Sequence, residues 1–256
     1  MQETPSYRTV VIGGLTTRYL SVGTGPALIL VHGWAQSAVT WRGVISNLAQ
    51  EYTVYALDMP GFGMSEAPPS AWSIEEYAQF VHSFCEALSL SPYAVLGHSF
   101  GARVALSYAA TFGAPKLLLV SMGDWNRVGW FRKLNTAIIH TVGRLMPGFL
   151  FYMHKTFLTP REFADNARVE REHGKRMLAV YMRTHQKGDD TIFSRVKAKT
   201  LLIYGKSDPI TAVSIGSRIQ LRIAGSTLVV IPDAGHLVHI EQPSAFLAPI
   251  LAFLRG

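Results

Sequence analysis

The segment Gly97-His98-Ser99-Phe100-Gly101 has the spacing G-x-S-x-G, which places a serine between two glycines. It follows an apolar run over 93–96 and precedes a helical pattern over 102–111. In a sharp turn from strand to helix, flanking glycines let neighbouring backbones approach, and the serine side chain projects clear of the sheet. An incidental serine in a glycine-rich turn would lack this strand and helix on either side. The sequence therefore predicts that Ser99 is a nucleophile.

A serine nucleophile needs a general base, and the base needs a carboxylate that orients it. Asp208 comes just after the apolar run 200–204, and His236 comes just after the run 227–231. In chains with this motif the acid usually follows the serine, and the histidine comes last. If the runs are parallel strands, all three side chains reach one edge of the sheet. We therefore expect Ser99, Asp208 and His236 to form a catalytic triad.

Several other side chains compete for these roles. Asp124 follows the run 116–121 and is an alternative acid, whereas Asp233 is expected to shape the turn before His236. His239 is an alternative base, but we expect it to face a helix or the core, and we expect His98 to support the turn around Ser99. His236 and His239 also form an H-x-x-H pair. With no third ligand nearby in the sequence, no metal site is expected.

Attack on a carbonyl also needs two donors for the oxyanion that forms. One is the backbone N–H of Phe100, the residue after the nucleophile. The other is expected from the loop after the run 27–31, which reads His32-Gly33-Trp34, and there the backbone N–H of Trp34 is the predicted donor. Gly33 gives this backbone room to turn, and a structural role is expected for His32.

The elements around these residues predict an α/β fold. Residues 7–12 and 15–22 flank Gly13-Gly14 and read as a β-hairpin. Short apolar runs without polar alternation follow, which is typical of parallel strands buried on both faces. Ser73-Ile74-Glu75-Glu76 has the spacing of a capping box and opens a helix to about residue 88, and Pro243 is expected to begin the last helix. The predicted runs are 27–31, 53–57, 93–96, 116–121, 200–204 and 227–231.

Residues 122–198 interrupt this alternation, because they contain no convincing strand and read as several helices. We expect 1–121 and 199–256 to form one core domain, and 122–198 to be a helical cap inserted over the carboxyl edge of the sheet, where open α/β sheets bind ligands. Its apolar side chains supply the candidate substrate contacts, and these are Trp130, Phe131 and Phe149.

The charge of the chain is concentrated in the same segment. Residues 122–198 hold 14 Lys and Arg against 7 Asp and Glu, whereas the rest of the chain holds 10 of each kind. The net charge of +7 therefore belongs entirely to the predicted cap. A basic surface favours anionic partners, although basic residues that merely solvate an insertion would give the same count. The apolar side chains there could bind an acyl chain, lie on a membrane surface, or form the cap's own core.

Composition excludes several other classes. The single cysteine, Cys85, allows no internal disulfide and is expected in the core. The N-terminus does not resemble a secretory signal and no run of about 18 apolar residues occurs, so no transmembrane segment is expected and the cytoplasm is the default location. Gly61 and Gly63 lack the third glycine of a dinucleotide loop, because Glu66 stands there. No nucleic-acid partner is expected.

These pieces together resemble the α/β-hydrolase-fold serine esterases. The residues that carry the resemblance are His32-Gly33, Asp58-x-Pro60-Gly61-x-Gly63-x-Ser65, Gly97-x-Ser99-x-Gly101, Asp208 and Gly235-His236, in that order. Among members with a cap, the size and His32-Gly33-Trp34 resemble pimeloyl-carrier-protein methyl ester esterases. That resemblance implies a substrate carried by an acidic acyl carrier protein, which would dock on the basic cap.

The expected activity is hydrolysis of a carboxylic ester with a mainly apolar acyl part, through an acyl-enzyme and without a cofactor. Two alternatives stay open on the same fold. One is hydrolysis of a C–C bond in a vinylogous diketone, which uses the same triad. The other is a ligand receptor that keeps the triad but has negligible turnover.

Overall fold

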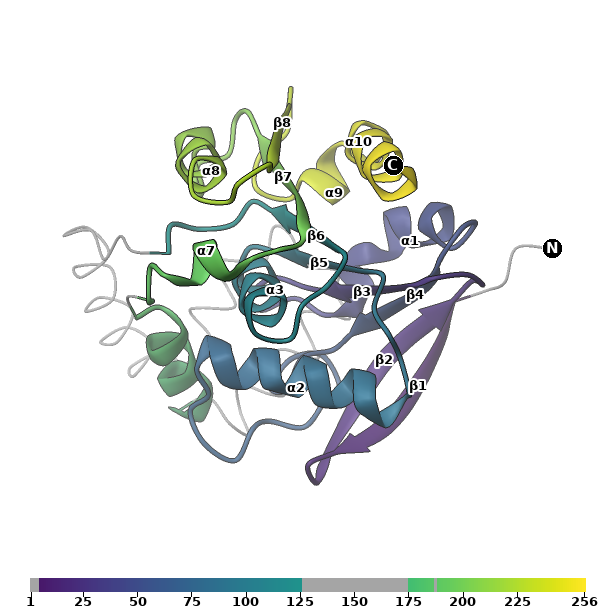
Figure 1. Cartoon of the computed structure of the whole chain (residues 1–256). Coiled ribbons are helices and arrows are strands. Elements are labelled where there is room, and N and C mark those ends of the chain that lie inside the picture. Colours follow the sequence, from purple (N-terminus) through teal and green to yellow (C-terminus); the bar gives the residue numbers. More distant parts are fainter. Residues whose placement is uncertain (1–4, 126–174, 187) are drawn as a thin grey trace.

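The centre of the molecule is one sheet of eight strands in the order β1-β2-β4-β3-β5-β6-β7-β8 (Figure 1). The computed structural model describes residues 5–125, 175–186 and 188–256. Strands β3 to β8 pair in parallel, whereas β1 and β2 are antiparallel to their neighbours. The strands are β1 Ser6–Ile12, β2 Leu15–Val22, β3 Ala27–Val31, β4 Thr53–Leu57, β5 Ala94–His98, β6 Lys116–Val120, β7 Lys199–Gly205 and β8 Thr227–Ile231.

The predicted α/β class and its mostly parallel sheet are confirmed. Successive side chains of β3 point to opposite faces, so that Leu28 and Leu30 belong to one core cluster and Ile29 and Val31 to the other. All four are fully buried, which explains why this strand shows no polar alternation. At the edge of the sheet β8 is partly exposed, and its Val230 is 37% accessible.

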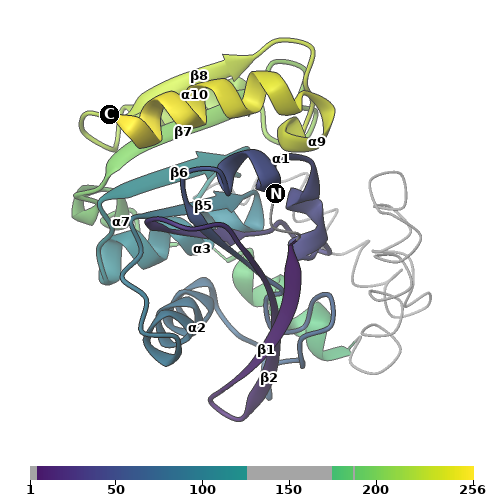
Figure 2. The ribbon, with the colours of Figure 1, turned by 90° about the vertical axis from the view of Figure 1, so that its right-hand side faces the viewer.

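Helices cover both faces of the sheet. One layer packs on the face of Ile29, and the other packs on the face of Leu28 (Figures 1 and 2). The first layer contains α2 Ile74–Ala87, α3 Phe100–Thr111, α7 Ile192–Arg195 and α8 Val213–Gln220. The second contains α1 Arg42–Leu48, α9 Val238–Glu241 and α10 Pro243–Arg255, and the short 3-10 helix η1, Ala38–Trp41, precedes α1.

Local sequence signals explain several boundaries. The predicted hairpin turn has positive φ angles of 56° at Gly13 and 81° at Gly14, which a residue with a side chain rarely adopts. The capping box at α2 is present, because Ser73 Oγ accepts the amide of Glu76 and the Glu76 carboxylate accepts the amide of Ser73. Helix α10 has Pro243 as its first residue, as predicted.

The segment predicted as a cap is only partly described. Residues 175–184 form a helix, α7 follows it, and none of the described residues of 122–198 lies in a strand. The candidates Trp130, Phe131 and Phe149 lie outside the described residues. In the described ranges, no helix combines the length and the apolar character that crossing a membrane requires.

Candidate active site

Ser99 occupies the sharp turn between β5 and α3. Its φ and ψ are 52° and −108°, an uncommon conformation for a residue with a side chain that costs about 1–3 kcal/mol. Its amide donates to the carbonyl of Val120 on the neighbouring strand at 2.8 Å, which holds the turn against the sheet. The sharp turn, which the motif predicted, places the Ser99 side chain at the start of α3.

The two glycines of the motif are required by close backbone approaches. A Cβ at Gly97 would lie 2.1 Å from the carbonyl oxygen of Gly101, and a Cβ at Gly101 would lie 2.2 Å from the carbonyl oxygen of Val31. Both obstacles are backbone atoms, so a larger residue at position 97 would push α3 away from β5, and one at position 101 would push α3 away from β3. The spacing G-x-S-x-G is therefore a packing requirement here.

Ser99, His236 and Asp208 form one continuous hydrogen-bonded chain. Ser99 Oγ lies 3.1 Å from His236 Nε2, and His236 Nδ1 lies 2.8 Å from Asp208 Oδ2. The Asp208 carboxylate is fully buried, whereas 12% of the His236 side chain is exposed. An ionised carboxylate only accepts, so Nδ1 carries the proton and Nε2 is left to accept the proton of the serine. The arrangement can therefore deprotonate Ser99.

Asp208 is held as an anion by its own loop. The amides of Ile210 and Thr211 donate to Oδ1 at 2.7 and 2.8 Å, and the Thr211 hydroxyl donates to Oδ2. Burial alone would raise the pKa of this carboxyl, but the hydrogen bond and charge of His236, together with the bonds from Thr211, outweigh it and lower the pKa below its usual value. The carboxylate therefore stays charged where it faces the imidazole.

The alternative acids lie elsewhere. Asp124 forms an ion pair with Arg218 at 2.8 Å. Asp233 has a φ of 53°, and its carbonyl accepts from the side chain of Gln242, so it belongs to the turn before His236 as expected. Of these carboxylates, Asp208 is the one that contacts the imidazole of His236.

The other histidines around the site, His239, His98 and His32, are buried and contact atoms of the surrounding loops and helices. His239 Nε2 lies 2.9 Å from the Thr40 hydroxyl, and burial lowers its pKa to about 3. His98 lies with its ring 4.9 Å from that of His236. His32 Nε2 accepts the amide of Met59, and its Nδ1–H donates to the carbonyl of Gly33. Among the described residues, no group of three or more His, Cys, Asp or Glu is arranged to hold a metal ion.

The loop after β3 lies beside the turn at Ser99. The Trp34 ring meets the rings of Phe62 and Phe100 edge-on at 5.0 and 5.7 Å. Phe100 begins α3, so its N–H is one of the amides that a helix leaves without an intrahelical acceptor. Gln36, which the motif reasoning did not single out, accepts the amide of Gly33 at 2.8 Å and so fixes the backbone leading into Trp34.

The described part of the predicted cap rests on this loop. Tyr181 meets the Trp34 ring at 5.0 Å between centroids and stacks on His185 at 3.9 Å. Arg103, one turn into α3 from Ser99, donates to the carbonyls of Thr184 and Gln186. Residues 175–186 are therefore tied both to the Trp34 loop and to the helix that follows Ser99.

The glycine-rich segment after β4, which includes Gly61 and Gly63, forms a structured turn. Buried Asp58 pairs with Arg18 at 2.6 Å and accepts the amide of Ala38 at 2.8 Å. Gly63 has a φ of 56°, and a Cβ there would lie 2.4 Å from the Asp58 carboxylate. The turn thus wraps around Asp58, which also fixes the start of η1.

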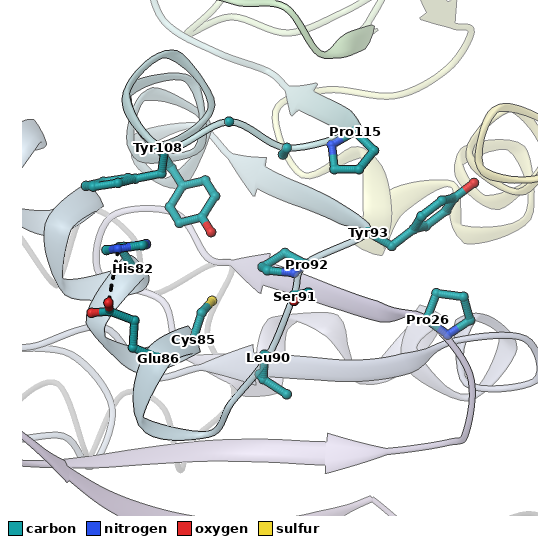
Figure 3. A pocket seen from close by; sticks show the side chains of 13 residues that line it. Pro26, His82, Cys85, Glu86, Leu90, Ser91, Pro92, Tyr93, Tyr108 and Pro115 are labelled. Carbon is teal, nitrogen blue, oxygen red and sulfur yellow. Dashed lines mark ion pairs between the residues drawn. The ribbon is translucent and has the colours of Figure 1, made fainter.

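An open pocket of about 640 Å³ lies at the amino ends of the parallel strands, opposite the carboxyl ends that Ser99 follows (Figure 3). Pro26, Tyr93 and Pro115 line it, and they directly precede β3, β5 and β6, whereas Ser99 follows β5. His82 pairs with Glu86 at its side, and Cys85 is buried there, as predicted for this residue. Burial raises the pKa of the Cys85 thiol to about 12, so the thiol stays protonated. This pocket is separate from the Ser99 site.

The mostly parallel sheet covered by helices makes this an α/β protein, and comparison with known proteins gives its family. The chain belongs to the α/β-hydrolase fold family, whose sequence profile matches residues 26–243. It is similar to 2-hydroxy-6-oxo-6-(2'-aminophenyl)hexa-2,4-dienoic acid hydrolase of Metapseudomonas resinovorans, with 27% identity over 96% of this chain and 90% of that protein. These findings support a hydrolase.

Two further similarities bear on the expectations. A pimeloyl-[acyl-carrier protein] methyl ester esterase of Aeromonas hydrophila is 36% identical over 27% of this chain and 29% of that protein. The structure of a thermophilic esterase from Thermogutta terrifontis superposes with a TM-score of 0.78 at 24% identity, over 98% of both chains. The latter agrees with the fold, and the former covers only a short part of the chain.

Proposed function

We propose that this protein is a serine hydrolase that cleaves carboxylic esters with a mainly apolar acyl part. The observation that supports the proposal is a pair of hydrogen bonds that links the three side chains. Ser99 Oγ lies 3.1 Å from His236 Nε2, and His236 Nδ1 lies 2.8 Å from Asp208 Oδ2. This hydrogen-bonded chain starts from a nucleophile held in a strained turn, and it ends on an anion held by its own loop.

The chemistry follows from this geometry. His236 accepts the proton of Ser99 while Oγ attacks the ester carbonyl, and Asp208 stabilises the imidazolium that forms. The backbone amides of Trp34 and Phe100 donate to the oxyanion, and loss of one such donor typically costs about 10²–10³ in turnover. The imidazolium then protonates the leaving alkoxide. Water activated by His236 hydrolyses the acyl-enzyme and returns the proton to Ser99. No cofactor takes part in these steps.

The apolar acyl part and the cap belong to the same proposal. Trp34, Phe62 and Phe100 form an aromatic cluster beside the turn at Ser99, and Tyr181 lies against Trp34. We assign 1–121 and 199–256 to the core domain and 122–198 to the cap, whose Trp130, Phe131 and Phe149 are the candidates for contacts with the acyl part. The proposed partner is an acidic acyl carrier protein, which the resemblance to pimeloyl-carrier-protein methyl ester esterases implies and with which the positive charge of this segment agrees.

A fluorophosphonate probe and a panel of esters of varied acyl length test the proposal. The expected result is labelling of the wild-type protein at one serine and turnover that rises with acyl length. Ser99→Ala should abolish both, while Ser91→Ala, at the far edge of the sheet, should abolish neither. Labelling that persists in Ser99→Ala would remove Ser99 as the nucleophile.

A second candidate is hydrolysis of a C–C bond, and the similarity to the dienoic acid hydrolase over 96% of this chain favours it. The same triad would serve it. Following the absorbance of a 2-hydroxy-6-oxo-hexa-2,4-dienoate separates the two reactions. Loss of the chromophore without ester turnover would replace the esterase proposal. Labelling of Ser99 with neither turnover would favour a ligand receptor.

A further inference from the structure

The side chain of His98 bridges two loops that the proposed mechanism needs. Its Nδ1 lies 3.0 Å from Gln36 Oε1, and its Nε2 lies 2.9 Å from the backbone carbonyl oxygen of His236. His98 is 1% exposed, and it directly precedes Ser99 in the sequence. It therefore contacts the Trp34 side of the site and the His236 side at the same time.

Gln36 continues the connection to the Trp34 loop. The side-chain oxygen of Gln36 accepts the backbone amide of Gly33, and the backbone amide of Gln36 donates to the carbonyl of Gly33 at 3.2 Å. A Cβ at Gly33 would lie 2.6 Å from both Gln36 Oε1 and His98 Nδ1, so the loop backbone fits directly against this pair. Trp34, whose N–H is the assigned oxyanion donor, is the next residue.

We propose that Gln36 and His98 are positioning residues that fasten the loop of Trp34 to the loop of His236. This inference rests on the proposed function. Their role is to keep the oxyanion donor and the general base in register on either side of Ser99. Such register matters because a displacement of about 1 Å in an active site can lower a rate by about a hundredfold.

The two contacts of the His98 ring need more protons than a neutral imidazole carries. Because Gly33 N–H fixes the Gln36 amide with its oxygen inward, both ring nitrogens of His98 face oxygen acceptors. A neutral imidazole has a single N–H, so it donates to one of these oxygens and holds the other loop only by packing against it. Burial lowers the pKa of His98, and the neighbouring His239, His236 and His32 lower it further, so the second proton is disfavoured. A carboxylate at position 36 would accept from Gly33 and also stabilise that second proton.

The experiment measures fluorophosphonate labelling of Ser99, which needs the base and the oxyanion donors whatever the natural substrate is. We compare the maximal labelling rate and the half-saturating probe concentration for Gln36→Met, Gln36→Glu, His98→Asn and the double variant Gln36→Met/His98→Asn. Thr200→Val is the matched control, because the Thr200 hydroxyl is also buried and bonded to a backbone carbonyl, but at the start of β7.

Gln36→Met and His98→Asn should each lower the maximal rate by about tenfold to a hundredfold, with little change in half-saturation. The double variant should be no slower than the slower single variant, because both break one connection. Gln36→Glu should stay within about threefold of the wild type, and Thr200→Val should keep the wild-type rate even if its Tm falls. These results would not follow from a loss of stability alone.

Two results would overturn the inference while leaving the proposed function intact. One is a double variant whose loss is the product of the two single losses, and the other is a Gln36→Met variant with the wild-type rate. Absence of labelling at Ser99 in the wild-type protein would instead overturn the proposed function, and the inference would fall with it.

Discussion

At the scale of single residues, the carboxylate of Asp208 decides which nitrogen of His236 carries its proton. An amide in its place can present its NH₂ group to Nδ1, which favours the tautomer that cannot accept the proton of Ser99. We therefore expect Asp208→Asn to lower kcat by up to about 10⁴, the loss that the equivalent change causes in a serine protease triad. Steady-state hydrolysis of a small ester measures it, with Tm recorded beside it.

Asp124→Asn is the matched control for this prediction. Asp124 pairs with Arg218, and the two side chains are 16% and 45% exposed, so the pair contributes about 1 kcal/mol or less to stability. Because this pair lies outside the hydrogen-bonded chain of Ser99, His236 and Asp208, we expect kcat within about threefold of the wild type for Asp124→Asn. If instead Asp124→Asn abolishes activity and Asp208→Asn does not, the acid has been assigned to the wrong carboxylate.

Residue spacing predicted the geometry of Ser99, Asp208 and His236, because each follows a strand that has its own apolar signature. It gave no signal for Gln36. That side chain lies in a loop without periodicity, and its partners are a backbone amide and a histidine 62 positions away. His98 was expected to support the turn, but a pattern of five letters does not show that its ring reaches the carbonyl of His236.

At the scale of elements, the order of strands and helices was predictable because parallel strands buried on both faces are continuous apolar runs. The structure extends β5 to His98 and begins α3 at Phe100, two residues earlier than the helical pattern, since the strained turn at Ser99 leaves no loop between them. The packing of α9 against η1 was not predictable, because it depends on tertiary contacts between two very short helices.

The packing of α9 against η1 predicts a pH dependence of stability. The His239 ring of α9 lies 4.6 Å from the Trp41 ring of η1 at a tilt of 34° and contacts the Thr40 hydroxyl, and burial lowers the pKa of His239 to about 3. Its pKa in the unfolded chain is about 6.5, so between those values the unfolded state binds the extra proton. Stability therefore falls as the pH falls from about 6.5 towards 3, with a limiting slope of about 1.4 kcal/mol per pH unit.

His239→Phe tests this assignment, because it keeps a ring against Trp41 but cannot titrate. At pH 7.5 the variant should be less stable by about 1 kcal/mol, since the Thr40 hydroxyl loses its partner. Between pH 6.5 and 4 it should lose less stability than the wild type, although His98 and His32 still titrate. Denaturant unfolding at a series of pH values measures the difference. A constant gap between the two proteins across that range would contradict the buried, neutral state of His239.

At the scale of the whole molecule, the parallel sheet is what assembles the site. Ser99, Asp208 and His236 follow β5, β7 and β8, whose carboxyl ends share one edge, so residues up to 137 positions apart meet within hydrogen-bond distance. The sheet prediction and the site prediction therefore depend on each other. The charge of the chain is distributed unevenly, since residues 1–121 and 199–256 together are neutral and 122–198 carries the whole excess of +7.

That division of charge makes the acyl carrier proposal testable by salt. Attraction between a basic segment and an acidic carrier weakens as the Debye length shrinks from about 10 Å at 0.1 M to about 3 Å at 1 M salt. For a carrier-bound methyl ester we expect kcat/KM to fall by more than about tenfold over that range, and for a small neutral ester by less than about twofold. Lys175→Glu should weaken the carrier reaction alone. Arg8→Glu makes an equal charge change on the exposed strand β1 and should alter neither reaction. Equal salt sensitivity of the two esters would exclude carrier docking.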